Sequence, residues 1–433
     1  MKITLFQAIL FGAFGLSALV GLFVFATYTN KSGGSAEIGT VVIWGTLPRD
    51  TMQSALVSAT QANTALKNVS YVQKDPATLS GELASAIATG SAPDLVLDSQ
   101  EGLHALSRFI TPIPFEALSP STFTNSFIQG AGIFTTQGGY YGIPFLVDPL
   151  VLFANRSILS SSGIARPPST WEALVGLVPN VARTTATRQV TRGLIALGTY
   201  NNVHNARGIL SALFIQTGVP ISSYSASGML SANLGTSESG GKPPGQAVLK
   251  FYTQFADPSK VSYTWNTSLP DSQQAFLSGD LALYLGYSSE VQYLRDANPN
   301  LNFYVVSFPQ PATASIKNLY GRIYTLMIPR GAKNPSGAYQ VAAILSGSAE
   351  QSVFAGATGL APASLNVLAM APADPADAVA YAEALYTSGW LSPATGDTDA
   401  IFSGMINNVI SGRSTLQGAL VSAGSALTEL LQQ

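Results

Sequence analysis

The sequence predicts an α/β protein of two lobes, preceded by an N-terminal transmembrane helix. Three observations lead to this fold class. The chain has 433 residues, and at roughly 100–200 residues per domain this length is more than one hydrophobic core usually holds. Short β-branched apolar runs alternate with helical patterns after residue 38, which is typical of a parallel sheet. The first 30 residues are almost continuously apolar.

Residues 1–30 predict a membrane segment. No charged residue occurs from Ile3 to Asn30, and a bilayer is crossed by about 20 apolar residues. A secretory signal has a shorter apolar region of about 7–15 residues, followed by a small-x-small cleavage site. Residues 26–28 (Ala-Thr-Tyr) fit such a site poorly. We therefore predict an uncleaved signal-anchor, with a cleaved signal peptide as the alternative.

The charges beside this segment predict its orientation. Lys2 and the amino terminus favour a cytoplasmic N-terminus. The rest of the chain is then expected on the extracytoplasmic side of the cell membrane, as the binding domain of a single-pass protein. Residues 31–37, which contain Lys-Ser-Gly-Gly-Ser, predict a flexible tether.

The first lobe is expected to begin with a β-α-β-α-β unit. Its strands are predicted at 40–44, 69–73 and 92–97, and its helices at 50–65 and 79–88. In such a unit the crossovers are right-handed and ligands bind at the carboxyl ends of the strands. Residues 44–47 and 98–101 follow two of these strands, so they are expected at the ligand-binding edge.

The composition excludes several classes of function. Charged residues make up 10% of the chain, with 21 Lys and Arg against 23 Asp and Glu, so there is no basic surface for nucleic acid. The sequence has no cysteine, which excludes disulfides, thiolate catalysis, cysteine metal ligands and cysteine-linked lipid. His104 and His204 are the two histidines and lie far apart. We therefore expect no metal site, no cofactor and no nucleic-acid partner.

Several sequence blocks resemble one known family. They are residues 84–96 (ASAIATGSAPDLV), 139–155 (GYYGIPFLVDPLVLFAN), 167–174 (PPSTWEAL), 275–282 (AFLSGDLA) and 410–414 (ISGRS). In order and spacing these blocks are similar to those of extracellular solute-binding proteins of the maltose-binding-protein type, the receptors of ABC sugar importers. Two positions depart from the family pattern: the usual lipid-bearing cysteine is missing, and Ala154 stands where a Tyr is common.

The resemblance implies a two-lobe periplasmic-binding-protein fold of type II. The first lobe is expected over 38–147 plus 324–357, and the second over 148–323 plus 358–433. The family's function implies capture of a carbohydrate, an oligosaccharide, by hinge closure, and delivery to ABC transporter permease subunits.

Candidate ligand-binding residues come from two arguments. Trp44, Thr46, Asp98, Gln100 and Glu101 follow from the predicted strand ends, where aromatic rings stack on sugars and polar groups bind hydroxyls. The resemblance adds the following residues: Asp148, Tyr287, Ser288, Ser289 and Arg322. Trp390 follows Gly389 in a loop-like stretch, where its indole is expected to cap the ligand. Alternatives remain open, namely core packing for both tryptophans, helix capping for Asp98 or Ser99, and a surface ion pair for Arg322.

No motif demands an enzyme. A glycosidase requires two carboxylates at a fixed separation, and none of the acidic residues lies in a recognisable catalytic motif. We predict a membrane-tethered transport receptor. A tethered glycan-binding sensor or adhesin on the same fold is the alternative, and a glycan hydrolase is a weaker one.

Overall fold

The computed structural model describes residues 38–225, 227–236, 243–370 and 372–433. The predicted membrane helix at 1–30 and the predicted tether at 31–37 lie outside these residues. Within the described part of the chain, no helix is both long enough and apolar enough to cross a membrane.

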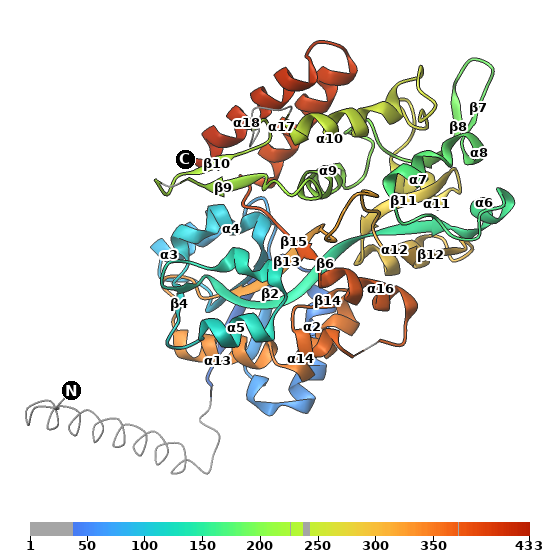
Figure 1. Ribbon diagram of the computed structural model, residues 1–433. Helices are drawn as coiled ribbons and strands as arrows, with labels where there is room; N and C mark the ends of the chain where they lie inside the picture. The colour runs from blue at the N-terminus through green and yellow to red at the C-terminus, as the bar shows by residue number, and fades with distance from the viewer. Residues whose placement is uncertain (1–37, 226, 237–242, 371) are drawn as a thin grey trace, which may run out of the picture.

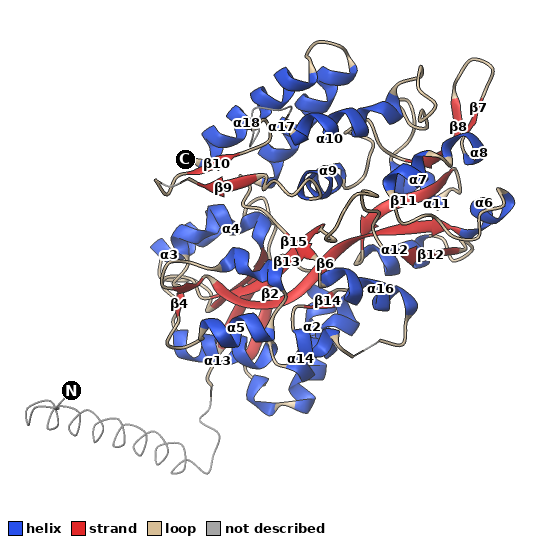
Figure 2. Cartoon of the chain, viewed as in Figure 1, coloured by secondary structure: helices blue, strands red, loops and turns tan. Residues whose placement is uncertain are grey.

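One large sheet runs through the whole molecule (Figure 1). Its strands lie in the order β2-β1-β3-β13-β6-β11-β8-β7, with β12 and β14 paired to β6 and β15 paired to β13. Helices cover both faces of the sheet in each lobe (Figure 2), as the alternating sequence pattern predicts.

The first lobe begins with the predicted β-α-β-α-β unit. Strand β1 pairs in parallel with β2 on one side and with β3 on the other. These elements are β1 (Val41–Gly45), α2 (Arg49–Ala62), β2 (Val69–Gln73), α3 (Leu79–Ala88), β3 (Leu95–Ser99) and α4 (Gln100–Leu106). Every residue of β3 is buried, because helices cover both of its faces, and this explains its continuous apolar run.

The rest of this lobe consists of shorter strands and later helices. They are β4 (Ile113–Pro114), α5 (Pro120–Ser126), β5 (Gly139–Tyr140), α13 (Pro335–Leu345), α14 (Ser348–Thr358), β14 (Ala361–Pro362), α15 (Leu365–Leu368) and α16 (Pro375–Ala384). Helix α14 packs against α2, so late sequence completes the first lobe.

The second lobe holds the remaining elements. Its strands are β7 (Arg183–Thr184), β8 (Val190–Ile195), β9 (Ser222–Tyr224), β10 (Leu230–Ala232), β11 (Leu281–Tyr287) and β12 (Phe303–Val306). Its helices are α6 (Arg156–Ser161), α7 (Trp171–Val175), α8 (Val178–Val181), α9 (Ala206–Ile215), α10 (Pro244–Thr253), α11 (Ser272–Leu277), α12 (Glu290–Ala297), α17 (Thr395–Ile410) and α18 (Leu416–Leu431).

Two long strands connect the lobes. Strand β6 (Gly142–Asn155) pairs with β13 (Leu319–Met327) through residues 142–149 and with β11 through residues 150–154. All residues of β6 are buried. The short strand β15 (Thr387–Ser388) pairs with the start of β13 and belongs to a third connection. The lobes are therefore joined by three neighbouring segments, an arrangement suited to hinge motion.

Two hydrophobic cores correspond to the two lobes. The first contains residues up to Val147 and resumes at Ile323, whereas the second begins at Leu150 and includes Tyr320. Along the chain, the core therefore changes between Val147 and Leu150 and again between Tyr320 and Ile323. The first core also includes Leu360, Ala361, Ala363, Ala380 and Ala384. Residues 358–384 therefore pack mainly with the first lobe, and the third crossing comes later than the predicted division at 357.

Candidate ligand-binding site

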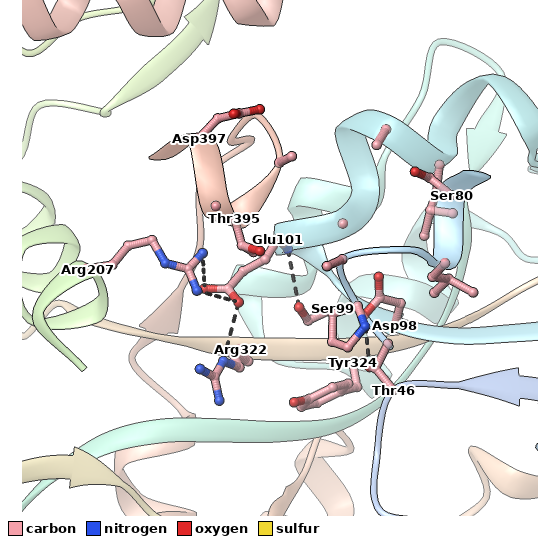
Figure 3. Close-up of a pocket in the computed structure, with 18 residues that line it drawn as sticks. Thr46, Ser80, Asp98, Ser99, Glu101, Arg207, Arg322, Tyr324, Thr395 and Asp397 are labelled. Carbon is pink, nitrogen blue, oxygen red and sulfur yellow. Dashed lines mark hydrogen bonds and ion pairs between the residues drawn. The ribbon is translucent and has the colours of Figure 1, made fainter. Parts of the chain in front are cut away.

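A cavity of about 470 Å³ lies between the lobes, within the size range of small-molecule sites. The first lobe lines it through Thr46, Asp98 and Glu101, and through residues of α3 and α4. The second lobe lines it through Arg207 and residues 394–397, and β13 lines it through Arg322 and Tyr324. Both lobes and one connecting strand thus contribute to a single cavity (Figure 3).

The fold places four of the predicted residues in this lining, Arg322 of β13 and three residues of the first lobe. Thr46 follows β1, Asp98 lies near the end of β3, and Glu101 lies in the first turn of α4. Because β1 and β3 are parallel neighbours, their carboxyl ends meet at one edge. The Ser99 hydroxyl accepts a hydrogen bond from the Glu101 amide at 3.3 Å, so Ser99 caps α4 and fixes the direction in which Glu101 leaves the sheet.

Glu101 is the centre of a charged network that joins the lobes. Its Oε1 lies 3.2 Å from Nη1 of Arg207, and its Oε2 lies 3.3 Å from Nε of Arg322. The Tyr320 hydroxyl donates to Oε1 at 2.5 Å. In Figure 3, both arginines point toward this carboxylate. Burial acts to raise the pKa of Glu101, but the two guanidinium groups and the Tyr320 hydroxyl outweigh it and lower the pKa. Glu101 is therefore a buried, ionised carboxylate held from both lobes.

Arg207 was not among the predicted residues, although it holds Glu101 from the second lobe. It lies in the first turn of α9, and its Nε is also 3.4 Å from Oδ1 of Asp399. A cation is unfavourable near a helix N-terminus, and Arg207 is the only charge in that helix. A lone arginine in the first turn of an apolar helix thus indicated that carboxylates from other elements lie beside it.

Arg322 lies on β13, between the lobes. Its guanidinium stacks over the Tyr287 ring at 3.9 Å, and its Nη1 lies 3.8 Å from Oδ2 of Asp148. Burial raises the pKa of the Tyr287 hydroxyl. The alternative of a surface ion pair is wrong, because the carboxylate partners of Arg322, Glu101 and Asp148, are both buried.

Asp148 ties β6 to the turn between β11 and α12. Its Oδ1 accepts from the Ser289 amide at 3.0 Å and from the Ser288 hydroxyl at 3.1 Å, and its Oδ2 accepts from the Ser289 hydroxyl at 2.8 Å. Burial raises the pKa of Asp148, with the Arg322 charge acting in the opposite direction. The structure therefore brings Asp148, Ser288 and Ser289 together beneath Arg322, but none of the three lines the interlobe cavity.

A second depression of about 430 Å³ lies on the other side of the two arginines. Its lining includes Arg207 and Arg322 again, together with Tyr287, Asp399 and Asp271. His204 Nδ1 lies 3.5 Å from Oδ2 of Asp271 in this depression. The charged network thus separates two hollows along the cleft, and Tyr287 contributes to the second one.

Besides Asp148, Ser288 and Ser289, three further predicted residues lie outside both hollows. The Gln100 side chain is fully buried; its Nε2 donates to the Gly321 carbonyl at 3.0 Å, and its Oε1 accepts from the Ile323 amide at 2.7 Å. Trp390 is buried, stacks on Phe402, and donates through Nε1 to Ser211 at 3.0 Å. These side chains serve packing and cross-linking.

Trp44 is the third of these residues. It is partly buried against the first core, and the Lys74 ammonium lies 3.9 Å above its ring. That ammonium lies 2.6 Å from Oε2 of Glu82. Trp44 therefore lies beside the cleft edge of the sheet, with one face of its ring already covered.

Asp98 is a second buried carboxylate of the cavity, beside Glu101. Its side chain is 5% exposed, and its Oδ1 accepts from the Thr46 hydroxyl at 3.0 Å. Burial raises its pKa to about 7, while hydrogen bonds from the Ser99 backbone and from Thr46 act to lower it. Asp98 thus changes charge near neutral pH, where a ligand's charge or hydrogen bonding can decide its state.

Comparisons with known proteins identify the family. Residues 55–383 match the family of bacterial extracellular solute-binding proteins. No curated protein sequence matches the chain.

Solved structures share the fold at low sequence identity. The cyclic α-maltosyl-1,6-maltose binding protein of Arthrobacter globiformis is 14% identical, with 91% of this chain and 99% of that chain covered and a TM-score of 0.72. An ABC transporter solute-binding protein of Thermotoga lettingae bound with α-D-tagatose is 17% identical, with coverages of 91% and 100% and a TM-score of 0.67. The maltotriose-binding protein of Thermus thermophilus is 17% identical, with coverages of 90% and 99% and a TM-score of 0.64.

These structures confirm the two-lobe periplasmic-binding-protein fold, and the family match confirms the resemblance in the sequence motifs. The match covers most of the chain and both lobes. The chain belongs to the family of bacterial extracellular solute-binding proteins.

Proposed function

We propose that this chain is a carbohydrate receptor of an ABC importer and captures an oligosaccharide between its lobes. The observation that carries the proposal is the interlobe cavity, which takes polar side chains from both lobes and from β13. Membership of a solute-binding family agrees with the prediction that the chain is not an enzyme.

The chemistry of the cavity supports a hydroxyl-rich ligand. Thr46, Asp98, Ser99 and Tyr324 offer hydroxyl and carboxylate groups to it, and such groups exchange hydrogen bonds with sugar hydroxyls. Structures that share the fold carry α-D-tagatose, maltotriose and maltotetraose.

Hinge closure is the proposed mechanism of capture. Strands β6 and β13 continue from one lobe into the other, so bending of these strands would move Arg207 relative to Thr46 and Asp98. A ligand that contacts both lobes is fully bound only when the cleft is shut, and it shifts the open–closed equilibrium by its greater affinity for the closed form.

Membrane tethering and delivery to a permease complete the proposal. The long apolar segment at 1–30 supports a single-pass anchor that places the two lobes outside the cytoplasm. The closed form would then dock on permease subunits of the importer. Carbonate extraction of membranes tests the anchor: the full chain should stay in the pellet, and a chain without residues 1–30 should be released.

A thermal-shift screen tests ligand capture. The full chain in detergent is mixed with a panel of oligosaccharides, and the melting temperature should rise with the logarithm of ligand concentration over Kd. A ligand at 100 times its Kd stabilises the protein by roughly 2.7 kcal/mol, a readily measured shift. A panel without any stabilising carbohydrate would contradict the proposal.

A further inference from the structure

Carboxylates outnumber cations along the interlobe cleft. The linings of the two hollows contain five carboxylates: Asp98, Glu101, Asp271, Asp397 and Asp399. The same linings contain two guanidinium groups, Arg207 and Arg322, and one histidine, His204. A cleft with low-dielectric walls concentrates such an excess of one sign and attracts ligands of the opposite charge.

Both arginines are already paired with carboxylates. Arg207 lies between Glu101 and Asp399, at 3.2 and 3.4 Å. Arg322 lies between Glu101 and Asp148, at 3.3 and 3.8 Å. The guanidinium groups therefore balance the charged network and leave little positive charge for a further acidic group in the cavity.

Asp98 is left without a cationic partner. Among the described residues it makes no ion pair, and its hydrogen bonds come from the neutral Thr46 hydroxyl and the Ser99 backbone. The Arg322 charge also acts to lower the pKa of Asp98, but more weakly than burial raises it. Its side chain is 5% exposed, and the small remaining exposure opens into the cavity. A buried charge without an opposite charge is costly, and burial raises the pKa of this carboxyl to about 7.

The cavity offers little surface for stacking on a neutral sugar. Tyr324 is the single aromatic residue of its described lining, and it is 7% exposed. Trp44, the aromatic residue expected at this edge, lies outside the lining, with Lys74 over its ring. Charge is thus a more prominent feature of this cavity than aromatic surface is.

We propose that the captured carbohydrate carries a protonated amino group, and that this ammonium binds the Asp98 carboxylate. This inference rests on the function proposed above and names the class of sugar. An ammonium supplies both a hydrogen-bond donor and the missing positive charge, whereas a hydroxyl supplies a donor alone. Carboxylates at the rim, such as Asp397 in the first turn of α17, would draw the cation into the cleft.

The size of the expected effect follows from the charge. A hydrogen bond between charged groups is worth more than a neutral one by about 1.4 kcal/mol, a factor of ten. An amino sugar should therefore bind about tenfold or more tightly than the same sugar with its amine acetylated. Acetylation keeps one N–H donor and removes the charge, so this pair of ligands isolates the charge.

Isothermal titration calorimetry on the full chain in detergent at pH 7 tests the proposal. The probes are glucosamine and galactosamine trimers, their N-acetylated counterparts, maltotriose as a neutral oligosaccharide, and spermidine as an amine that is not a sugar. We expect an amino-sugar trimer to bind at least about tenfold more tightly than its acetylated counterpart and than spermidine.

Variants assign the preference to a residue. Asp98→Asn should remove the preference for the amine, while Asp296→Asn, on the exposed face of α12, should keep it. A melting curve of Asp98→Asn shows whether that variant is folded. Asp397→Asn at the exposed rim tests the contribution of the rim charge. It should reduce the preference for the amine by about two- to threefold at low salt.

Each outcome has a definite meaning. If maltotriose or an acetylated trimer binds as tightly as the amino sugars, the inference is overturned and the carbohydrate receptor stands. If spermidine alone binds, the carbohydrate function itself is overturned. An amine preference that survives in folded Asp98→Asn would also overturn the assignment to Asp98.

Discussion

At the scale of the residue, Asp98 combines burial with the lack of a cationic partner. Its pKa of about 7 stands well above its usual value of 3.8, because the folded protein disfavours the charged form. The carboxyl of Asp98 thus holds its proton more tightly in the folded than in the unfolded chain. The stability from this difference is fully present below about pH 3.8 and is lost as the pH rises through about 7.

Asp98→Asn should therefore stabilise the ligand-free protein at pH 8. The amide cannot ionise, so the variant avoids the cost of charging a buried group, which is about 4 kcal/mol as an upper bound for a shift of this size. Urea unfolding at pH 4 and pH 8 measures the difference. The gain should be present at pH 8 and nearly absent at pH 4, with Asp296→Asn unchanged at both. An equal gain at both pH values would contradict the raised pKa.

Gln100 also departs from its predicted role in ligand binding. Its buried amide makes two hydrogen bonds to the backbone of β13, and their loss leaves buried backbone groups unpaired. Gln100→Ala should lower the free energy of unfolding by about 2–3 kcal/mol, and Gln292→Ala, on the exposed face of α12, by less than about 0.5 kcal/mol. Urea unfolding measures both; equal losses would show that the Gln100 hydrogen bonds contribute nothing.

The sequence predicted which residues lie near the site better than it predicted what each side chain contacts. Thr46, Asp98 and Glu101 follow from strand ends, which are local features of the sequence, and all three line the cavity. Whether a polar side chain faces the cavity or the neighbouring strand depends on contacts with distant sequence. Gln100 is next to Glu101, yet it turns to Gly321 and Ile323 on β13. No local pattern distinguishes the two.

At the scale of the element, the junction of β3 and α4 positions the site. Gly102 lies in the first turn of α4, and a Cβ atom added there would come within 2.0 Å of Oδ2 of Asp98. Such an approach forces the carboxylate to move. The glycine thus lets the helix start close enough to the strand for the carboxylate to fit between them.

Gly102→Ala should therefore weaken ligand binding by displacing Asp98. Gly81→Ala in α3 is a matched control, because an added Cβ there meets nothing within 4 Å. The control should leave affinity unchanged and stabilise its helix by up to about 1 kcal/mol. Calorimetric titration of both variants with the best ligand of the screen measures the affinities. Equal affinities would mean that the junction does not position Asp98.

Helices and strands were likewise predictable where the signal for them lies within their own sequence. The β-α-β-α-β unit was predicted because each of its elements carries its own apolar period. The third crossing came later than expected because β14 adds to the first lobe by pairing with β6, far away in sequence. A two-residue strand has no period that would reveal this pairing.

At the scale of the whole molecule, the charged network of Glu101, Arg207, Arg322 and Tyr320 holds the lobes together. Glu101 and Arg207 are separated by 106 positions, so only the fold brings them to 3.2 Å. A buried carboxylate that loses its charge leaves its arginine partner uncompensated. The open–closed equilibrium should therefore depend on the ion pair between Glu101 and Arg207.

Glu101→Gln should open the ligand-free protein. Because the chain has no cysteine, spin labels can be attached at Ser54→Cys on α2 and Ser422→Cys on α18, which are exposed positions on opposite lobes. Pulsed electron paramagnetic resonance then measures the distribution of distances between the two spin labels. Loss of about 2 kcal/mol from the ion pair corresponds to a roughly thirtyfold shift toward the open form, seen as a second population at altered distance. Glu82→Gln, whose ion pair with Lys74 lies within the first lobe, should keep the original distribution. If Glu101→Gln keeps it as well, the ion pair does not hold the lobes, and closure must depend on the packing of β6 and β13.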